Sequence, residues 1–490
     1  MHLEDAIASW QQAQTIYREL QDPYNEGATF NNIGLAYIGL GNNNEGIKAY
    51  EQSLAIARST NNRQMEVNAL ANLGRAADAL HDYTQALEFY QEALPIAREL
   101  KNRLGEGSIA TGIALAYQLL GNYQKASEFY LLMLAVAREL NDPVTEATAL
   151  AHLGIVHQAL SDYPKAAQFL EERLALSQIL NNKDSDRVIL GILGNVYHSM
   201  GNYPKAIERM QQSLALAEEL NQPRVMGEVL NNIGNIYADL GEYQQAIAFY
   251  EKGLQVARKS SNTVSEKELL LNLGTLYQTS LGDFPKALEY YQQCPAIPFS
   301  NDSLDAYQVE ADGKLLCEIY QRMAIIYQLQ GDYSQAVDLY RQSLTITREI
   351  NYTAGETAIL NNWATLYVAN LGDYQQALAL YQQTLEISRN TGNLQLEGKA
   401  LGNLAYIYDA LGDSTRAIDY QRQRLDIAQQ TADRQGEGTA LNNLGAMLLK
   451  TGKAEEAEAV LLSSIEVWES LRISLGNNDA AKISIFDEQA

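Results

Sequence analysis

The chain has 490 residues with 36 Lys and Arg against 60 Asp and Glu, so its formal net charge is −24 at pH 7. This excess of acid opposes phosphate backbones and anionic membranes, which excludes nucleic acid and lipid as expected partners. The N-terminal sequence MHLEDAIASW has acids where a signal peptide needs basic residues, and no apolar run of about 18 residues occurs. We therefore expect a soluble, cytoplasmic protein.

One pattern recurs from the beginning of the chain. Residues 1–22 match only its second half, because Ala6 aligns with Gly46 and Ala86, so we predict a partial first repeat that consists of a second helix alone. From residue 23 the full pattern reads apolar, small, two residues, Tyr, then Leu-Gly-Asp-Tyr, two residues and Ala, and most of its eleven copies are spaced by 40 residues. Such a period is typical of a solenoid, in which each repeat buries its apolar face against its neighbours. We predict one continuous domain, with repeats 1–7 over residues 23–291.

Each repeat is predicted to form two antiparallel helices. Leu230, Ile233, Gly234 and Tyr237 recur at helical spacing and form one buried stripe on the first helix. Glycines such as Gly121 stand where a helix ends in a left-handed residue, and the Asp or Asn that follows can cap the second helix. The fold is therefore expected to be all-α.

The residue after the central apolar position is always small, as at Gly34, Ala114 and Gly234. Glycine inside a helix costs about 1 kcal/mol relative to alanine, so we expect a close approach of two helix backbones at this position. The 30 tyrosines, against 8 phenylalanines, fall mostly on three repeat positions. An aromatic cofactor site is the alternative, but core packing, with the hydroxyl reaching a partner, is the interpretation that we favour.

Charged residues flank the junctions between repeats. Arg often ends the second helix and Glu often begins the next first helix, which suits the dipole at both helix ends. The arginines include Arg58, Arg98, Arg138, Arg348 and Arg389, and the glutamates include Glu66, Glu106, Glu146, Glu356 and Glu397.

Three departures from the repeat follow along the chain. Repeats 7 and 9 carry one extra residue before Gly282 and Gly372, which predicts a local change of superhelical pitch. Residues 292–320 are predicted to be an irregular insertion because prolines end the helix there, and it is either a tolerated loop or a hinge or docking loop that carries Phe299. Repeats 8–11 are predicted over 321–465, and the pattern is abandoned from Ser463, so residues 466–490 are expected to be a C-terminal helix or linker toward a missing downstream domain.

Enzymatic chemistry is not indicated by any motif. The two cysteines, Cys294 and Cys317, are expected to be free thiols, since they are too few for a disulfide framework and lack metal-ligand spacing. His152 and His157 are five residues apart and point to different helix faces, which argues against a metal site. No phosphate loop, nucleophile elbow or zinc spacing appears. We expect no catalytic, cofactor or metal site in this chain.

Asparagines form the candidate binding site. They recur opposite the buried stripe of the first helices, where an amide can donate to and accept from the backbone of an extended peptide. The alternative for each of them is that the amide ties adjacent helices together. Glu228, Asp239 and Glu268 make this face acidic, so we expect an extended, neutral to basic protein or peptide segment as partner. The candidate residues are Asn32, Asn72, Asn195, Asn231, Asn232, Asn235, Asn272, Asn362, Asn403 and Asn443.

The signature Asn-Leu-Gly-x-x-Tyr, Leu-Gly-Asp-Tyr, Ala, Tyr covers nearly all of residues 6–465. It resembles the tetratricopeptide repeat in its 40-residue form, as in Pins/LGN-type scaffolds and kinesin light chains. This resemblance implies a right-handed superhelical solenoid of antiparallel helix pairs whose first helices line a concave groove.

Residues 463–490 resemble the segment that follows tetratricopeptide arrays in bacterial proteins with a C-terminal CHAT domain, a caspase-like protease. One hypothesis is therefore a protein-binding sensor or targeting region of such a larger protein. The alternative is a free-standing adaptor of the Pins/LGN or kinesin-light-chain kind, with no attached enzyme. The oligomeric state, the signal and the partner's identity are not indicated by the sequence.

Overall fold

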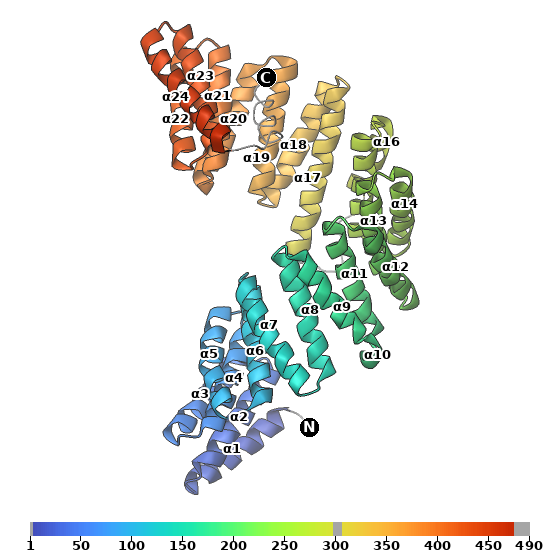
Figure 1. Ribbon diagram of the computed structural model, residues 1–490, viewed down its shortest axis with the longest axis vertical. Coiled ribbons are helices and arrows are strands. Elements are labelled where there is room, and N and C mark those ends of the chain that lie inside the picture. The colour runs from blue at the N-terminus through green and yellow to red at the C-terminus, as the bar shows by residue number, and fades with distance from the viewer. Residues whose placement is uncertain (1–2, 297–305, 475–490) are drawn as a thin grey trace. The chain divides into compact units, whose positions relative to one another are not determined.

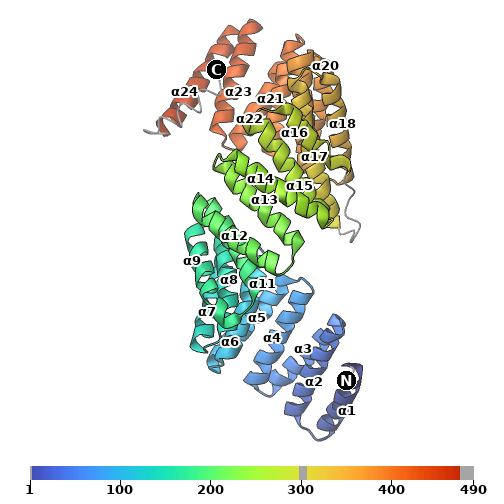
Figure 2. The same cartoon turned by 90° about the vertical axis from the view of Figure 1, so that its right-hand side faces the viewer.

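The computed structural model describes residues 3–296 and 306–474, and every regular element in these two ranges is helical. The contacts divide the chain into two units, Met1–Ser260 and Ser261–Ala490. Within each unit consecutive helices pack side by side and run in opposite directions (Figures 1 and 2). The expected all-α solenoid of antiparallel helix pairs is thus confirmed.

Unit 1 holds α1 to α14. The even-numbered helices α2 to α8, then α11 and α13, are the first helices of their repeats. The bounds are α1 Leu3–Glu19, α2 Pro23–Gly39, α3 Asn43–Ser59, α4 Arg63–Ala79, α5 Tyr83–Glu99, α6 Arg103–Leu119, α7 Tyr123–Glu139, α8 Pro143–Ala159, α9 Tyr163–Ala175, α10 Ser177–Leu180, α11 Lys183–Ser199, α12 Tyr203–Glu219, α13 Pro223–Asp239 and α14 Tyr243–Lys259.

Unit 2 holds α15 to α24, of which the odd-numbered α15 to α19, then α21 and α23, are first helices. Two π-helical turns, η1 and η3, and a short 3₁₀ turn, η2, interrupt the series. The bounds are α15 Thr263–Thr275, η1 Leu276–Ser280, α16 Phe284–Tyr291, η2 Cys294–Ala296, α17 Ala306–Leu329, α18 Tyr333–Glu349, α19 Thr353–Leu366, η3 Tyr367–Leu371, α20 Tyr374–Thr391, α21 Leu394–Ala410, α22 Ser414–Gln430, α23 Arg434–Lys450 and α24 Ala454–Ser474.

The turn inside a repeat follows the predicted chemistry. Gly121 has a φ of +75°, a left-handed conformation that glycine adopts without steric cost. The side chain of Asn122 then caps α7 by accepting from the backbone N–H of Lys125 at 3.2 Å. Glycine at the helix end and a capping residue after it therefore place two helices antiparallel within each repeat.

The small position of the first helix packs against a side chain of the second helix. A Cβ on Gly34 would lie 2.5 Å from the Cε1 of Tyr50, and one on Gly154 would lie 2.5 Å from the Cδ2 of Leu170. The prediction that two helix backbones approach each other at this position is therefore wrong. The glycine instead makes room for the large side chain of the residue sixteen positions later. Tyr50 and Tyr130 are among the largest fully buried side chains, so core packing of these tyrosines is confirmed.

The extra residue of repeats 7 and 9 is absorbed inside the first helix. It lies in η1 and η3, where a π turn accommodates one additional residue. Tyr291 still packs against Gly274, now seventeen positions away rather than sixteen. The π turn therefore preserves the contact between the two helices of the pair.

The predicted irregular insertion at 292–320 extends too far. Helix α17 begins at Ala306, so residues 306–320 are helical. The carboxylate of Asp312 on α17 lies 3.1 Å from the ammonium of Lys267 on α15, and both side chains are at most 5% exposed. This buried ion pair links α17 to α15. Phe299 lies outside the described residues.

The predicted boundary at 465/466 falls inside a helix, because α24 continues to Ser474. Ser464 still makes a repeat contact, donating its hydroxyl to the carbonyl of Gly438 at 3.0 Å. Trp468 packs against the same glycine. The helix packing of a repeat therefore continues beyond Ser463, where the sequence pattern ends. Residues 475–490 lie outside the described range.

Candidate functional site

All ten candidate asparagines lie on first helices. Asn72 is buried at 9% exposure, and the other nine are half-buried. Neighbouring helices therefore partly enclose these positions. Burial alone is compatible with either role of the amides, binding a peptide or tying adjacent helices together.

Three of these amides bond to the preceding first helix. Asn72 donates its Nδ2 to the Oδ1 of Asn31 at 2.7 Å, and Asn403 donates in the same way to Asn361 at 3.1 Å. Asn362 donates to the Oε1 of Gln321 at 3.4 Å. These bonds support the structural alternative, a tie between adjacent helices, for these three residues. They also hold the first helices of successive repeats in register.

A fourth candidate supports the core instead. Asn235 accepts the hydroxyl of the buried Tyr250 at 2.7 Å. Other buried tyrosines find partners in the same region of the first helix: Tyr130 donates to Gln118 at 2.8 Å and Tyr291 to Gln278 at 2.9 Å. The buried rings thus bring their hydroxyls to the face where the asparagines lie.

Unit 1 carries a groove formed by two neighbouring pockets. One, of about 160 Å³, is lined by Asn31, Asn68, Asn72 and Asn102, among others. The other, of about 460 Å³, lies against α4 to α8. Both include Arg75 and Ser108, whose side chains are joined by a 2.8 Å hydrogen bond. We call these two pockets the unit 1 groove.

Arg75 and Asp78 belong to this groove and were not among the residues expected from the sequence. They follow the candidate Asn72 by three and six residues on α4, so Arg75 shares the face of Asn72 and Asp78 lies next to that face. A signal was present, since Asp78 is a carboxylate at a repeat position where the next two repeats have Gln118 and Gln158. Asp409 is the other carboxylate at this position, and it pairs with Lys450 at 2.8 Å, so Asp78 differs in lacking an ion pair with the described residues.

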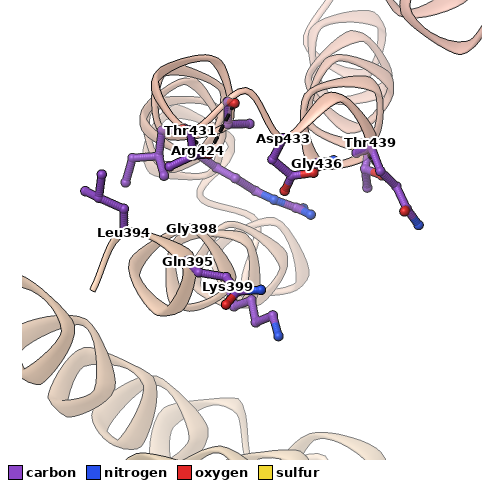
Figure 3. A pocket seen from close by; sticks show the side chains of 12 residues that line it. Leu394, Gln395, Gly398, Lys399, Arg424, Thr431, Asp433, Gly436 and Thr439 are labelled. Carbon is purple, nitrogen blue, oxygen red and sulfur yellow. Dashed lines mark hydrogen bonds between the residues drawn. The ribbon is translucent and has the colours of Figure 1, made fainter. Parts of the chain in front are cut away.

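Unit 2 carries a second groove. A pocket of about 540 Å³ lies between α21, α22 and α23, and a neighbouring pocket of about 390 Å³ shares Gln395 and Lys399 with it. Figure 3 shows the side chain of Arg424 reaching from α22 into the space between α21 and the start of α23. We call these two pockets the unit 2 groove.

Arg424 gives this groove a positive charge without a close counter-ion. It makes no hydrogen bond or ion pair with the described residues, and burial lowers its pKa although the charge of Asp433 acts in the opposite direction. The carboxylate of Asp433 is engaged elsewhere, accepting the backbone N–H of Gly436 at 2.9 Å as the cap of α23. With the exposed Lys399 nearby, this pocket can accept an anionic group.

His152, His157 and the two cysteines are engaged in packing. His152 stacks on Tyr130 with ring centroids 4.7 Å apart, and His157 bonds Ser127 at 3.1 Å. Cys294 and Cys317 are free thiols, and both are buried. Burial raises the pKa of Cys294 to about 12 and that of Cys317 to about 11. Across residues 3–296 and 306–474, no three His, Cys, Asp or Glu side chains gather as metal ligands do.

A membrane span is likewise not found in the described part of the chain, where no helix combines the length and apolarity needed to cross a bilayer.

Comparison with solved structures finds many helical-repeat chains at low identity. The apo form of RapI aligns with a TM-score of 0.47 and 14% identity, covering 72% of this chain and 99% of its own. The apo form of the quorum sensor NprR from B. thuringiensis gives 0.41 and 16%, covering 70% and 98%. A signal-transduction ATPase with a tetratricopeptide repeat sensor from Pyrococcus horikoshii gives 0.41 and 15%, covering 84% and 55%.

Comparison by sequence gives a clearer result, although no curated protein matches the chain. Three family models described as tetratricopeptide repeat match it. The first matches residues 25–99, 106–179, 225–294 and 356–430, which is more than half of the chain. The second matches 189–224 and 319–351, and the third matches 438–471.

Proposed function

Because the chain belongs to the tetratricopeptide repeat family, we propose that it is a protein-interaction scaffold that binds an extended segment of a partner protein along its first helices. The observation that carries this proposal is the unit 1 groove, in which successive first helices present amide, hydroxyl and apolar side chains in two pockets joined at Arg75 and Ser108. This mixture suits a peptide, whose backbone needs hydrogen-bond partners and whose side chains need apolar contacts.

Helix spacing supports an extended conformation of the bound segment. Neighbouring packed helices lie about 8–10 Å apart, and an extended chain advances about 3.3 Å per residue. About three residues of a partner would then pass each repeat. The hydrogen-bonding groups of the groove recur with every repeat, so they can serve the backbone whatever the partner's side chains are.

The charge of unit 1 favours a neutral to basic segment. Glu228 and Asp239 are exposed on α13, and Asp78 lines the unit 1 groove. The net charge of −24 adds a long-range attraction for cationic segments. The unit 2 groove, with Arg424 and Lys399, would accept an acidic residue of the same or another partner.

The context of the scaffold follows from the resemblance of residues 463–490 to the segment that precedes CHAT protease domains. We propose that the scaffold is the sensor or targeting region of a bacterial protein that carries such a protease. The alternative is a free-standing adaptor. The sequence encoded after Ala490 distinguishes them, since a His and a Cys in a βαβ context would support the protease.

Affinity capture with the full chain as bait tests the scaffold. Ser108 is exposed where the two pockets of the unit 1 groove meet, so Ser108→Trp should fill the groove. Glu88→Trp, on the exposed face of α5, adds the same ring outside the two pockets and is the matched control. We expect partners that are retained by the native chain and by the control and lost with Ser108→Trp. Equal capture by all three baits would contradict binding in this groove.

A further inference from the structure

The larger pocket of the unit 1 groove is lined by both polar and apolar side chains. Its volume of about 460 Å³ lies within the range of about 300–1,000 Å³ that is typical of ligand sites. Asp78, Tyr90, Ser108 and Thr111 contribute polar atoms. The apolar lining comes from Leu104, Leu115, Met133, Val136 and Leu140. Leu104 is 71% exposed, so part of this lining faces solvent.

One oxygen of the Asp78 carboxylate is buried without a partner. Its Oδ2 accepts the hydroxyl of Tyr90 at 2.7 Å, but its Oδ1 has no hydrogen-bond donor in the described structure. No cationic side chain of residues 3–296 or 306–474 forms an ion pair with it, and burial raises the pKa of Asp78 despite the bond from Tyr90. An unsatisfied buried acceptor is destabilising by about 1–3 kcal/mol, and in native proteins such a group calls for an explanation.

Tyr90 cannot move to relieve this arrangement, because its ring is held from two sides. A Cβ on Gly74 of α4 would lie 2.5 Å from the ring's Cε1, and a Cβ on Gly112 of α6 would lie 2.5 Å from its Cζ. The hydroxyl therefore stays on the Oδ2 of Asp78, and the Oδ1 remains a buried acceptor without a donor, which a ligand reaches when the side chains that cover it move aside.

The next repeat shows that the carboxylate is not needed for the fold. Gln118 occupies the position of Asp78 and accepts the hydroxyl of Tyr130 at 2.8 Å, the same bond made by a neutral amide. A glutamine would thus serve Tyr90 equally well. The negative charge of Asp78 is surplus to the packing of the repeat, which points to a ligand that uses it.

We propose that this pocket binds the side chain of a lysine in an extended partner segment, with its ammonium donating to the unpaired Oδ1 of Asp78. The proposal rests on the proposed function and names the partner chemistry of its unit 1 groove. The four-methylene stem of lysine suits the apolar lining, while its ammonium requires acceptors at the end. Thr111 of the same pocket provides a second acceptor, because its hydroxyl donates to the carbonyl of Gly107 at 2.9 Å and keeps its lone pairs.

Lysine fits this pocket better than arginine does. A guanidinium pairs best with both oxygens of a carboxylate, but Tyr90 occupies one of them, and a compact ammonium needs only the other. The two other charged side chains of the pocket bond to neutral groups. Arg75 donates to Asn72 and Ser108, and Asp142 caps α8 by accepting from Val144 and Thr145.

The test uses the full chain and two pools of fluorescein-labelled nonapeptides with blocked ends. The pools have the same randomised flanks and differ only at the centre, where one has lysine and the other norleucine, which keeps the stem and lacks the ammonium. We expect the lysine pool to bind about tenfold more tightly by fluorescence polarisation. Asp78→Gln, which copies the Gln118 arrangement, should remove this difference, whereas Glu88→Gln, an equal charge change on exposed α5, should keep it.

Each other outcome overturns a defined part of the proposal. Equal binding of both pools, or a preference for lysine that survives in Asp78→Gln, rejects the lysine pocket and leaves the scaffold standing. Failure of both pools to bind rejects the scaffold as well. Competition by free 1,5-diaminopentane as strong as that by the lysine pool would make the pocket a small-amine site and reject peptide docking. If Asp78→Gln loses helicity in circular dichroism, Asp78→Asn replaces it with the same criteria.

Discussion

The guanidinium of Arg173 lies 2.8 Å from the carboxylate of Asp186, at the repeat position that Arg424 occupies in α22. Arg173 is 3% exposed and also bonds the hydroxyl of Ser185 at 2.6 Å. Arg424 lacks such partners among the described residues and lines the unit 2 groove instead. The same position thus holds a structural arginine in one unit and an available one in the other.

Replacing these arginines by methionine should therefore have opposite consequences. Arg173→Met leaves Asp186 without its buried counter-ion and should destabilise its repeat by about 3–5 kcal/mol. Arg424→Met removes a desolvated charge that lacks an ion pair and should change stability by less than about 1 kcal/mol, while weakening the binding of an acidic peptide to the unit 2 groove. Hydrogen exchange of the two repeats measures the first effect, and titration with an acidic peptide measures the second. A large loss of stability in Arg424→Met would show that the guanidinium is structural.

The contact between Gly234 and Tyr250 should limit substitution at this glycine. Even a Cβ would overlap the ring, so Gly234→Leu should destabilise by about 1–3 kcal/mol through overpacking. Gly191 offers a matched control, because a Cβ there would meet only the hydroxyl of Ser213 at 3.7 Å. Gly191→Ala should be neutral or stabilising by up to about 1 kcal/mol. Hydrogen exchange should localise the Gly234 effect to the repeats around α13, and a uniform loss of protection along the chain would contradict nearest-neighbour stability.

Glu106 should make the stability of unit 1 sensitive to acid. Burial by itself raises the pKa of this carboxyl, but its bonds with Arg98 and Arg103 outweigh burial, so the net shift is downward. Because folding lowers this pKa, the ionised Glu106 stabilises the folded state fully at any pH above the pKa of the unfolded chain, about 4.3. This stabilisation is lost as the pH falls through the pKa of Glu106 in the folded state.

Glu106→Gln should therefore destabilise by roughly 1–2 kcal/mol at pH 7, since both arginines are more than a third exposed. The difference from the native chain should shrink as the pH falls below about 4. Glu128→Gln, which alters an exposed carboxylate on α7, should show neither effect. Urea unfolding at several pH values checks this, and a pH-independent difference would mean that Glu106 acts through packing alone.

Mutation distinguishes a binding asparagine from a structural one. Asn232→Ala should weaken partner binding by up to about tenfold, because a main-chain hydrogen bond contributes about 0.5–1.5 kcal/mol. Asn72→Ala removes a tie to Asn31 and should instead lower stability by a similar amount. Calorimetry with a captured partner peptide and circular dichroism distinguish these effects. Lost helicity in Asn232→Ala would make that amide structural.

Much of the fold follows from the sequence alone. Helix pairs are local: the three-and-four spacing of Leu230, Ile233 and Tyr237 and the left-handed Gly121 with its capping Asn122 act within a few residues of each other. Their repetition at a regular period implies nearest-neighbour packing. The face of the first helices that would hold a ligand follows from the same periodicity, because it lies opposite the buried stripe.

Tertiary structure decided the partners of individual side chains. The partner of Gly34 is the ring of Tyr50, the partner of Asp312 is Lys267, and the amide of Asn72 is used by Asn31, each across distances in sequence that a local pattern does not encode. Asp78 and Arg424 were not among the candidate residues of the sequence. Whether a charge is neutralised depends on which groups neighbouring helices bring within a few ångströms, and only the packed repeats determine that these two have no ion pair with the described residues.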